Sequence, residues 1–185
     1  MRIHVIIAAL FSVFFAATAS AQTDEAAWTA AAGEVRDAYW VALNAQHYDA
    51  AYAMCAPSTQ AVVGRGQFVE YEQRGRRDNG AVIERRVTRT TIYDNPPNAP
   101  APDVYVAFDF VSRYEATDRS CGYLILHQAN PGAPFRVVRS EQAFLDNATA
   151  ARAQEQGQSV DQMWAQMAAQ YCPGWQSDWI IPPPV

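Results

Sequence analysis

The chain has 185 residues, half of them apolar, and a formal net charge of -5, which suits one globular domain that buries a substantial core. A net acidic chain is a poor partner for nucleic acid or anionic lipid, because both are bound through cationic side chains, so we expect no nucleic-acid partner. Three cysteines without a Cys-x-x-Cys motif exclude a thioredoxin-type redox centre.

Residues 1–21 have the pattern of a cleavable signal peptide. A short basic start precedes an apolar run, residues 5–17, that is too short to span a bilayer, and Ala19 and Ala21 form a small-x-small cleavage site. The other interpretation of this run is a buried N-terminal helix. We expect cleavage after Ala21, a mature chain that begins at Gln22, no membrane span, and a periplasmic or secreted location.

Helical periodicity dominates the N-terminal half. Residues 24–45 predict a long amphipathic helix, and residues 48–56 predict a second, short one. Residues 58–63 add one further turn. Residues 67–74 predict a third helix, for which Gly75 is the expected C-terminal stop. The apolar stripe of the long helix consists of Trp28, Val35, Tyr39 and Leu43.

The first predicted strand covers residues 81–93, which are rich in β-branched side chains. Charged residues interrupt its alternation, which favours an edge strand or a solvated face and blocks pairing with another sheet. A proline-rich loop at residues 95–102 then stops strand pairing. The interrupting side chains are Arg85, Arg86 and Arg89.

Three further strands are predicted at residues 104–114, 120–127 and 135–144, separated by polar turns. The first of them alternates with period two, so its two sets of side chains face opposite sides of the sheet. We expect the helices to cover one set, because a meander with one apolar face is not stable alone in water. The covered set is Val104, Val106, Phe108 and Phe110. The opposite set is Tyr105, Ala107, Asp109 and Arg113.

Two helical pieces, residues 148–156 and 159–171, follow the sheet and lead into an irregular, proline-rich tail. Because the tail has apolar side chains without periodicity, we expect it to lie against the domain. The predicted organisation is one α+β domain at residues 22–145 and a helical extension with its tail, residues 146–185, packed on the same domain. The tryptophans of the tail are Trp175 and Trp179.

The three cysteines allow one disulfide and three pairings. Cys55 is in phase with Tyr48 and Tyr52 at helical spacing, which predicts a buried apolar thiol. The favoured disulfide therefore joins Cys121 to Cys172 in an oxidising compartment, and the two pairings with Cys55 are the alternatives.

The order of the elements, three helices, a strand and a three-strand meander, resembles the cone-shaped fold of nuclear transport factor 2 and ketosteroid isomerase. Within that fold, the chain resembles a secreted bacterial domain of unknown function, number 4019. The similarity rests on residues 48–52 (Tyr-Asp-Ala-Ala-Tyr), on residues 77–80 leading to 84–86, on the strand at 104–110, and on residues 135–137.

This resemblance covers residues 27–144 and implies a nuclear transport factor 2-like cone. In such an α+β fold, N-terminal helices pack on a curved four-stranded antiparallel sheet, here with a C-terminal helical extension. The chain departs from the family pattern where Phe135 replaces a tryptophan, and near Cys121, where an acidic residue is missing. The family has no established catalytic residues to transfer, and a fold alone does not specify a function.

Metal and nucleophile sites are not indicated. After cleavage the remaining histidines are His47 and His127, and no Cys/His cluster has ligand spacing, so we expect no metal or cofactor. We interpret both histidines as surface or capping residues. The Gly-x-Ser-x-Gly pattern of a nucleophile elbow is absent as well.

Asp109 is the candidate for acid–base chemistry, because a carboxylate desolvated in a cone cavity has a raised pKa. The alternation places it on the outer face, however, which favours a solvated residue paired with Arg113. Tyr39, Tyr52 and Tyr123 are candidate donors to an oxyanion, although tyrosines at this spacing usually belong to a core.

Arginines cluster on the third predicted helix and on the first strand. Guanidinium groups bind carboxylate or phosphate, so the cluster is a candidate anion site. Acidic residues lie among them, which favours a salt-bridged, solvated surface instead. The arginines are Arg74, Arg76, Arg77, Arg85, Arg86 and Arg89. The acidic residues are Glu70, Glu72, Asp78 and Glu84.

The sequence thus predicts a non-catalytic accessory domain of the cell envelope that binds a small molecule or a protein. The alternative is a cofactor-free lyase or isomerase that uses a buried carboxylate in the cone cavity. The expected partner is an unknown small molecule or envelope protein, and a dimer through the sheet face is open. The candidate pocket-lining residues are Tyr39, Tyr48, Tyr52, Phe68, Tyr71, Phe108 and Tyr123.

Overall fold

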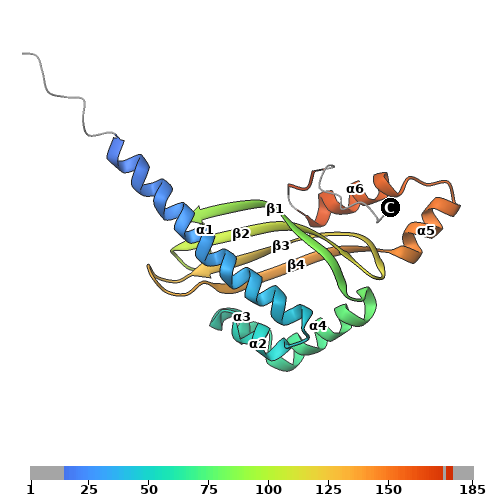
Figure 1. Cartoon of the computed structure of the whole chain (residues 1–185), viewed down its shortest axis with the longest axis horizontal. Helices are drawn as coiled ribbons and strands as arrows, with labels where there is room; N and C mark the ends of the chain where they lie inside the picture. The colour runs from blue at the N-terminus through green and yellow to red at the C-terminus, as the bar shows by residue number, and fades with distance from the viewer. Residues whose placement is uncertain (1–14, 173, 177–185) are drawn as a thin grey trace, which may run out of the picture.

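The computed structural model describes residues 15–172 and 174–176, with side chains from Asp24 onward. These residues form an α+β fold of six helices and four strands (Figure 1). The helices before the sheet are α1 (Phe15–Asn44), α2 (Tyr48–Ala53), α3 (Pro57–Val62) and α4 (Arg65–Asn79). The strands are β1 (Val82–Asp94), β2 (Val104–Tyr114), β3 (Thr117–Gln128) and β4 (Arg136–Asp146). The helices after the sheet are α5 (Asn147–Glu155) and α6 (Val160–Tyr171).

The four strands form one antiparallel sheet in the order β1-β2-β3-β4. β1 is an edge strand, as its arginines predicted. The central strands pair in a register that places Phe108 opposite Leu124. Figure 1 shows a twisted sheet with α1 lying across one side of it. β2 begins and ends at the predicted residues, because its alternation is the most regular in the chain.

α1, α2 and α4 cover one face of the sheet. Val106, Phe108 and Phe110 of β2 are at most 3% exposed and share a core with Tyr39 of α1 and Phe68 of α4. The predicted inner face of β2 is therefore confirmed. Burial of these aromatic and branched side chains is the main favourable contribution on this side of the sheet.

α5 and α6 pack on the opposite face, where Val111 and Cys121 of the sheet share a second apolar cluster with Trp164 of α6. A disulfide joins Cys121 to Cys172, with 6.0 Å between their Cα atoms, and Cys55 is a buried free thiol. A bonded pair of this kind indicates an oxidising, extracytoplasmic environment.

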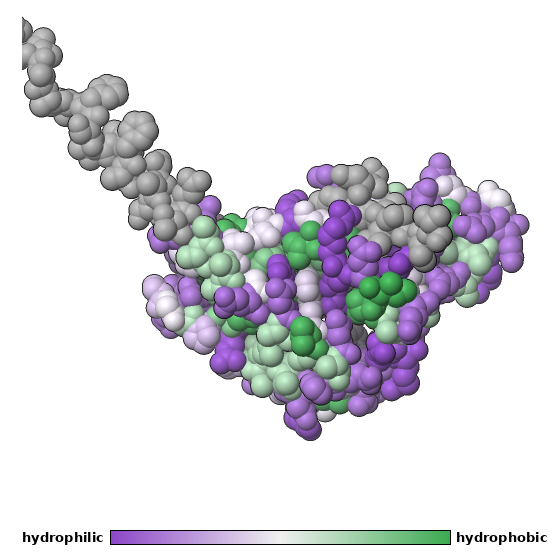
Figure 2. Space-filling view, in the orientation of Figure 1, coloured by the Kyte–Doolittle hydropathy of each residue, from purple (hydrophilic) through white to green (hydrophobic). Residues whose placement is uncertain are grey.

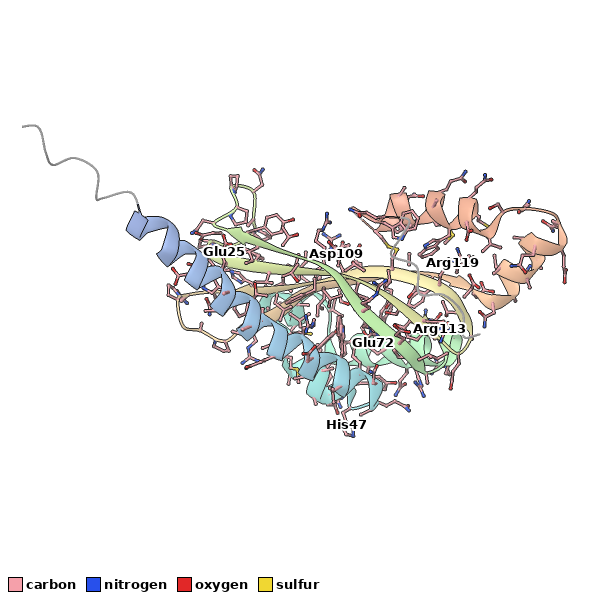
Figure 3. All side chains as sticks on the ribbon, turned by 45° about the horizontal axis from the view of Figure 1, so that its top comes forward. Glu25, His47, Glu72, Asp109, Arg113 and Arg119 are labelled. Atoms are coloured by element: carbon pink, nitrogen blue, oxygen red, sulfur yellow. A yellow bond between two sulfur atoms is a disulfide. The ribbon has the colours of Figure 1, made fainter. Side chains whose placement is uncertain are left out.

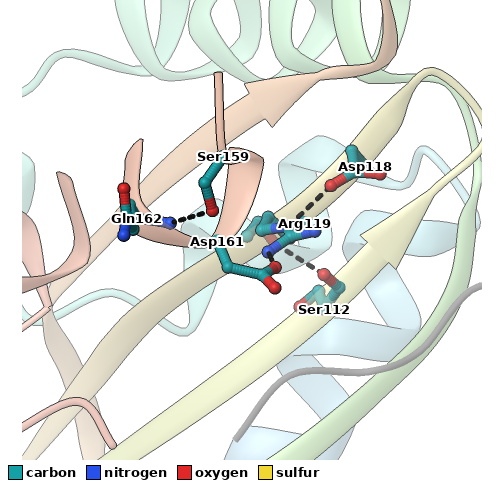
Figure 4. A network of polar contacts seen from close by, with 7 residues as sticks. Ser112, Asp118, Arg119, Ser159, Asp161 and Gln162 are labelled. Carbon is teal, nitrogen blue, oxygen red and sulfur yellow. Dashed lines mark hydrogen bonds and ion pairs between the residues drawn. The ribbon is translucent and has the colours of Figure 1, made fainter. Parts of the chain in front are cut away.

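Arg119 of β3 attaches α6 to the same face (Figure 4). Its guanidinium forms salt bridges with Asp118 and with Asp161 of α6, each with an N–O distance of 2.6 Å. The backbone N–H of Gln162 donates to Oγ of Ser159, which caps the helix at its start. The disulfide, the ion pair and the apolar cluster therefore all attach α6 to the sheet.

The chain leaves α2 earlier than predicted because it pairs with β4 at the level of Cys55. The N–H of Ala56 donates to the carbonyl of Val137 at 2.8 Å, and the N–H of Val137 donates to the carbonyl of Met54 at 3.0 Å. These bonds form one parallel bridge between Cys55 and Val137. Pro57 then begins α3 at a position where a helix needs no N–H donor.

α4 is longer than predicted, and the expected stop at Gly75 is wrong. The backbone remains helical through Gly75, and the helix ends at Asn79. Gly80 has a φ of 76°, and its N–H donates to the carbonyl of Arg76 at 3.0 Å. A glycine terminates a helix where the backbone takes a left-handed conformation, and that conformation occurs at Gly80.

The segment after the disulfide returns to the outer face of the sheet. Gly174, with a φ of 73°, lies directly against the guanidinium of Arg89, so that a Cβ at this position would collide with it. Trp175 is partly buried and packs on the α6 cluster. The predicted docking of Trp179 lies outside the described residues.

The described surface is mostly polar on the side drawn in Figure 2, where hydrophobic residues form separate small groups. Among the described residues, none of the helices is both long and apolar enough to span a bilayer. α1 begins at Phe15, so the predicted cleavage site after Ala21 falls within this helix, and cleavage stays a prediction.

Candidate functional site

A pocket of about 290 Å³ lies between the helices and the sheet, at the end where α4 turns into β1. Side chains from α1, α2, α4, β1, β2 and β4 line it. Its volume is at the lower end of the range of small-molecule sites. The apolar wall consists of Trp40, Leu43, Val82, Phe110 and Phe144. Trp40 and Phe110 meet edge to face, with ring centroids 5.2 Å apart.

Arg85 of β1 supplies a cation to this wall. Its guanidinium carbon lies 4.8 Å from the ring centroid of Trp40 and 5.5 Å from that of Phe110. Nε donates to Oγ of Ser112 at 3.1 Å, and Nη2 donates to the hydroxyl of Tyr114 at 2.9 Å. Nη1 is buried and has no hydrogen-bond partner. Two of the three guanidinium nitrogens of Arg85 are therefore hydrogen-bonded, and the third, Nη1, is not.

A chain of hydrogen bonds holds the partners of Arg85 in place. The hydroxyl of Tyr114 donates to Oε1 of Gln142 at 3.0 Å, and Nε2 of Gln142 donates to Oγ of Ser120 at 2.9 Å. Ser120 in turn donates to the carbonyl of Ser112 at 2.9 Å. Because these hydrogen bonds hold Ser112 and Tyr114 in place, the orientation of the guanidinium is set before any ligand binds.

Glu72 of α4 is one of the two carboxylates that line the pocket, together with Asp78. Figure 3 shows it on the helix side of the sheet, and among the described residues it forms no hydrogen bond or salt bridge. Burial raises the pKa of Glu72 to about 7, while the nearby positive charge of Arg85 lowers that pKa in part. A carboxyl group with this pKa exchanges protons near neutral pH, which is the property required of a general acid or base.

The negative charge of Glu72 also affects the pKa of other side chains. Burial raises the pKa of Tyr39, Cys55 and Tyr71, and in each case the negative charge of Glu72 is the next contribution. For Cys55 the pKa rises to about 11. These three groups therefore remain protonated at neutral pH and serve as neutral surroundings for the carboxylate.

Tyr48, the first residue of α2, contributes a second unsatisfied polar group. The residue is 8% exposed, and its hydroxyl is buried without a hydrogen-bond partner. A buried hydroxyl normally has a partner in the protein or in water. Tyr48 and Arg85, from different elements, therefore both line the pocket, and each has one buried polar atom without a partner.

The structure brings two of the predicted pocket residues, Tyr48 and Tyr71, to the pocket. The other five do not line it. Tyr39, Phe68 and Phe108 are core residues. Their spacing marked a buried face correctly, but in this protein that face is filled by side chains.

The remaining two predicted pocket residues have other partners. Tyr52 donates its hydroxyl hydrogen bond to the carbonyls of Gln60 and Val63. Tyr123 lies on the outer face of the sheet, where the guanidinium of Arg139 is 5.6 Å from its ring centroid. Neither tyrosine is available to an oxyanion in the pocket.

Asp109 is neither solvated nor paired with Arg113. It is 8% exposed, and its Oδ2 accepts a hydrogen bond of 2.7 Å from Nε of Arg89 on β1. It does face away from α1, α2 and α4, as the alternation predicted (Figure 3). Its cationic partner, Arg89, comes from the neighbouring strand β1. Residue spacing along the sequence does not identify such a partner. Asp109 is therefore a structural ion pair and no part of the pocket.

The predicted salt-bridged surface is correct for part of the arginine cluster. Arg74 and Glu70 form an exposed salt bridge of 2.9 Å on α4. Glu72 and Arg85 were wrongly assigned to that surface. The available signal was the position of Glu72 four residues after Phe68, which places both on the buried side of one helix.

The histidines take no part in the pocket. His47 is exposed before α2. His127 is 8% exposed, which contradicts the surface interpretation, because its Nε2 lies 2.8 Å from the carbonyl oxygen of Pro102 and its ring stacks on Tyr105. Among the described residues, no group of three or more His, Cys, Asp and Glu side chains is arranged to hold a metal ion.

Residues 36–139 match a family model described as a protein of unknown function (DUF4019), and this region contains most of the pocket, including Glu72 and Arg85. Neither a curated protein nor a solved structure matches the chain.

Proposed function

Because the chain belongs to the DUF4019 family, whose description assigns no activity, we propose a function from the pocket itself: binding of a small organic molecule. The observation that carries this proposal is the pair of buried, unsatisfied polar groups, the Tyr48 hydroxyl and Nη1 of Arg85, at one pocket. Each such group costs about 1–3 kcal/mol when it is left without a partner. A ligand that supplies the missing partners regains this free energy.

The rest of the lining supports a binding function. Apolar and aromatic side chains form the walls, and a few polar groups with fixed orientations interrupt them. This composition is typical of small-molecule sites, in which apolar burial provides affinity and the polar groups orient the ligand. Binding alone needs no further chemical group, so the protein acts as a non-catalytic binding domain.

Gly75 offers a direct test, because it lines the pocket and an added Cβ would meet no heavy atom within 4 Å. Gly75→Leu should fill pocket space while favouring the helix. Gly66→Leu is the matched control, since Gly66 lies in the same helix, is equally unobstructed and does not line the pocket. Each substitution should improve helix propensity by about 0.8–1 kcal/mol.

The measurement is native mass spectrometry of the exported protein, with identification of small molecules released on denaturation. The wild type and Gly66→Leu should carry the same ligand, and Gly75→Leu should lack it. Equal ligand content in all three proteins would place the binding site elsewhere. A ligand-free wild type that also binds no compound from a fragment library would contradict the proposal.

A second candidate function, a cofactor-free isomerase or lyase, is favoured by Glu72. Its pKa of about 7, which results mainly from burial, lets the carboxylate take a proton from carbon next to a carbonyl group. Arg85 would stabilise the enolate oxygen that forms, and the protonated Glu72 would return the proton to another carbon. The reacting carboxylate is thus Glu72 rather than Asp109.

Deuterium exchange tests this second function. Once a bound carbonyl compound is identified, incubation in deuterated water should place deuterium at its acidic carbon in the presence of the wild type. Glu72→Gln should abolish the exchange while the compound still binds. Binding without exchange in the wild type leaves the non-catalytic function as the correct one.

The proposal also includes the cellular location of the protein, its fold superfamily and its partner. The disulfide between Cys121 and Cys172 and the signal-like pattern of residues 1–21 support export to the periplasm or secretion. The four-stranded sheet covered by α1, α2 and α4 supports the nuclear transport factor 2-like cone. An envelope protein as partner is a further part of this proposal.

A further inference from the structure

Charged side chains of both signs line the pocket of a protein that is acidic overall. Three arginines and two carboxylates line it, whereas the whole chain has a net charge of -5. The charge that the pocket presents to a ligand therefore depends on which of these side chains already have an ionic partner. The arginines are Arg74, Arg76 and Arg85, and the carboxylates are Glu72 and Asp78.

Among the arginines, Arg85 differs in its partners. Arg74 is exposed and already neutralised by Glu70 at 2.9 Å. Arg85 has neutral partners only, the hydroxyls of Ser112 and Tyr114 and two aromatic rings, and no carboxylate lies within salt-bridge distance. A partly buried guanidinium without a counter-ion attracts an anion strongly, because little water competes for it.

The free donor fits a small charged group. Nη1 is the unsatisfied nitrogen, and the other two nitrogens of Arg85 are held by Ser112 and Tyr114. One unsatisfied nitrogen suits a carboxylate oxygen, whereas a phosphate group needs several donors around its oxygens. The guanidinium lies over the rings of Trp40 and Phe110, and the parts of these side chains that line the pocket provide an apolar surface for the rest of the molecule.

We propose that the ligand is a small organic acid whose carboxylate binds Nη1 of Arg85 and whose apolar body packs on Trp40 and Phe110. This inference rests on the proposed function, since it names the chemical class of the molecule that the pocket binds. The hydroxyl of Tyr48 then donates a hydrogen bond to a second polar atom of the acid. An amine is the contrasting class, because it would be attracted by Glu72 and repelled by Arg85.

The test uses matched compounds that share a body and differ in charge. One triple is indole-3-acetate, indole-3-acetamide and tryptamine, and a second is phenylacetate, phenylacetamide and phenethylamine. A third, aliphatic triple is isovalerate, isovaleramide and isoamylamine. Dissociation constants are measured by ligand-observed NMR on the wild type and on Gly75→Leu. We expect the acid to bind about tenfold or more tightly than its amide in at least one triple, and the amine to bind most weakly.

Two variants assign the preference to Arg85. Arg85→Gln should reduce acid binding to the level of the amide and leave amide binding nearly unchanged. Arg86→Gln is the matched control, because Arg86 is the next residue of β1 and is exposed outside the pocket. Both variants are checked for the wild-type circular dichroism spectrum, and Arg85→Lys provides a second variant that retains the charge if Arg85→Gln does not fold.

The outcomes separate this inference from the function on which it rests. If amides or amines bind as tightly as acids and Gly75→Leu weakens them all, the pocket binds small molecules but the acid inference is wrong. Loss of acid and amide binding to the same extent in Arg85→Gln has the same meaning. If no compound of the three triples binds, or if binding is equal in the wild type and Gly75→Leu, both proposals fail.

Discussion

Glu72 and Arg85 line the same pocket with opposite charges, yet no salt bridge joins them. Burial raises the pKa of Glu72 to about 7, and the guanidinium offsets only part of that effect. The pocket therefore contains a cation and a carboxylate that do not bind each other and are available to a ligand. A folded protein retains such a pair at some cost in stability, which is common at functional sites.

The stability of the protein should depend on pH through Glu72. The folded protein keeps a proton that the unfolded chain releases between pH 4.5 and 7, because the pKa of Glu72 is raised on folding. The stabilising contribution of the protonated group is fully present below pH 4.5 and is lost as the pH rises through 7. The slope is at most about 1.4 kcal/mol per pH unit.

Glu72→Gln should remove this dependence and be more stable than the wild type above pH 7. Urea unfolding across the range measures the effect, and Glu70→Gln is the control because Glu70 is exposed on the same helix. Parallel stability profiles of wild type and Glu72→Gln would show that Glu72 titrates normally.

Phe108 should be one of the most sensitive core positions. Its side chain is 1% exposed between α1 and the sheet, so Phe108→Ala should cost about 3–5 kcal/mol in unfolding free energy. Ile83→Ala on the edge strand is the control, since Ile83 is 53% exposed and should cost well under about 1 kcal/mol. Denaturant midpoints of the two variants give the comparison, and equal losses would contradict the described core.

Asp109→Ala should destabilise the protein by about 1–2 kcal/mol, because it removes a charge-assisted hydrogen bond with Arg89 from a mostly buried position. Ligand binding in the pocket should not change, since Asp109 lies on the other face of the sheet. Thermal unfolding and the NMR titration described above measure both effects. A variant as stable as the wild type would mean that Asp109 is solvated after all.

Loss of the disulfide should destabilise the attachment of α6. The bond between Cys121 and Cys172 spans a sequence separation of 51, for which the chain-entropy model gives about 4 kcal/mol. Replacement of both cysteines by serine should lower stability accordingly, whereas Cys55→Ala, at the free thiol, leaves the bond intact. Peptide mapping without reduction identifies the bond, and a peptide that contains Cys55 linked to either partner would falsify this pairing.

The exported protein should begin at Gln22. The small residues Ala19 and Ala21 after an apolar run predict this cleavage. Intact-mass measurement of protein recovered from the periplasm or medium gives the terminus. A mass that includes Met1, or protein found only in the cytosol, contradicts the prediction.

The strand patterns of the sequence predicted all four strands, although β3 begins three residues earlier than predicted, at Thr117, and β4 ends two residues later, at Asp146. The central strand β2 was placed correctly, and the charge of β1 identified an edge. Both properties depend on residues close in sequence, and burial on one face makes the pattern regular. The end of α4 was predicted wrongly because a glycine in the sequence does not by itself mark the end of a helix. Gly75 has a helical backbone conformation, whereas Gly80 does not.

The site could not be predicted in the same way. Glu72 was assigned to solvent because charged residues usually are, and its burial depends on strands that begin well after it in the chain. Asp109 was assigned a neighbour four residues away, Arg113, whereas its partner Arg89 lies across a strand pair. Such contacts follow from the pairing register, which includes a shift between Val87 and Arg89.

The bridge between Cys55 and Val137 has a consequence for assembly. Unpaired strand edges invite lateral growth, in which copies of a protein join their sheets into one. The segment that follows α2 occupies the backbone of β4 at Val137, so the outer edge of that strand is interrupted by the chain's own residues. At the opposite edge, exposed charges such as Glu84 and Arg86 discourage an approaching strand. Edge-to-edge joining of the sheets of two copies should therefore be disfavoured at both edges.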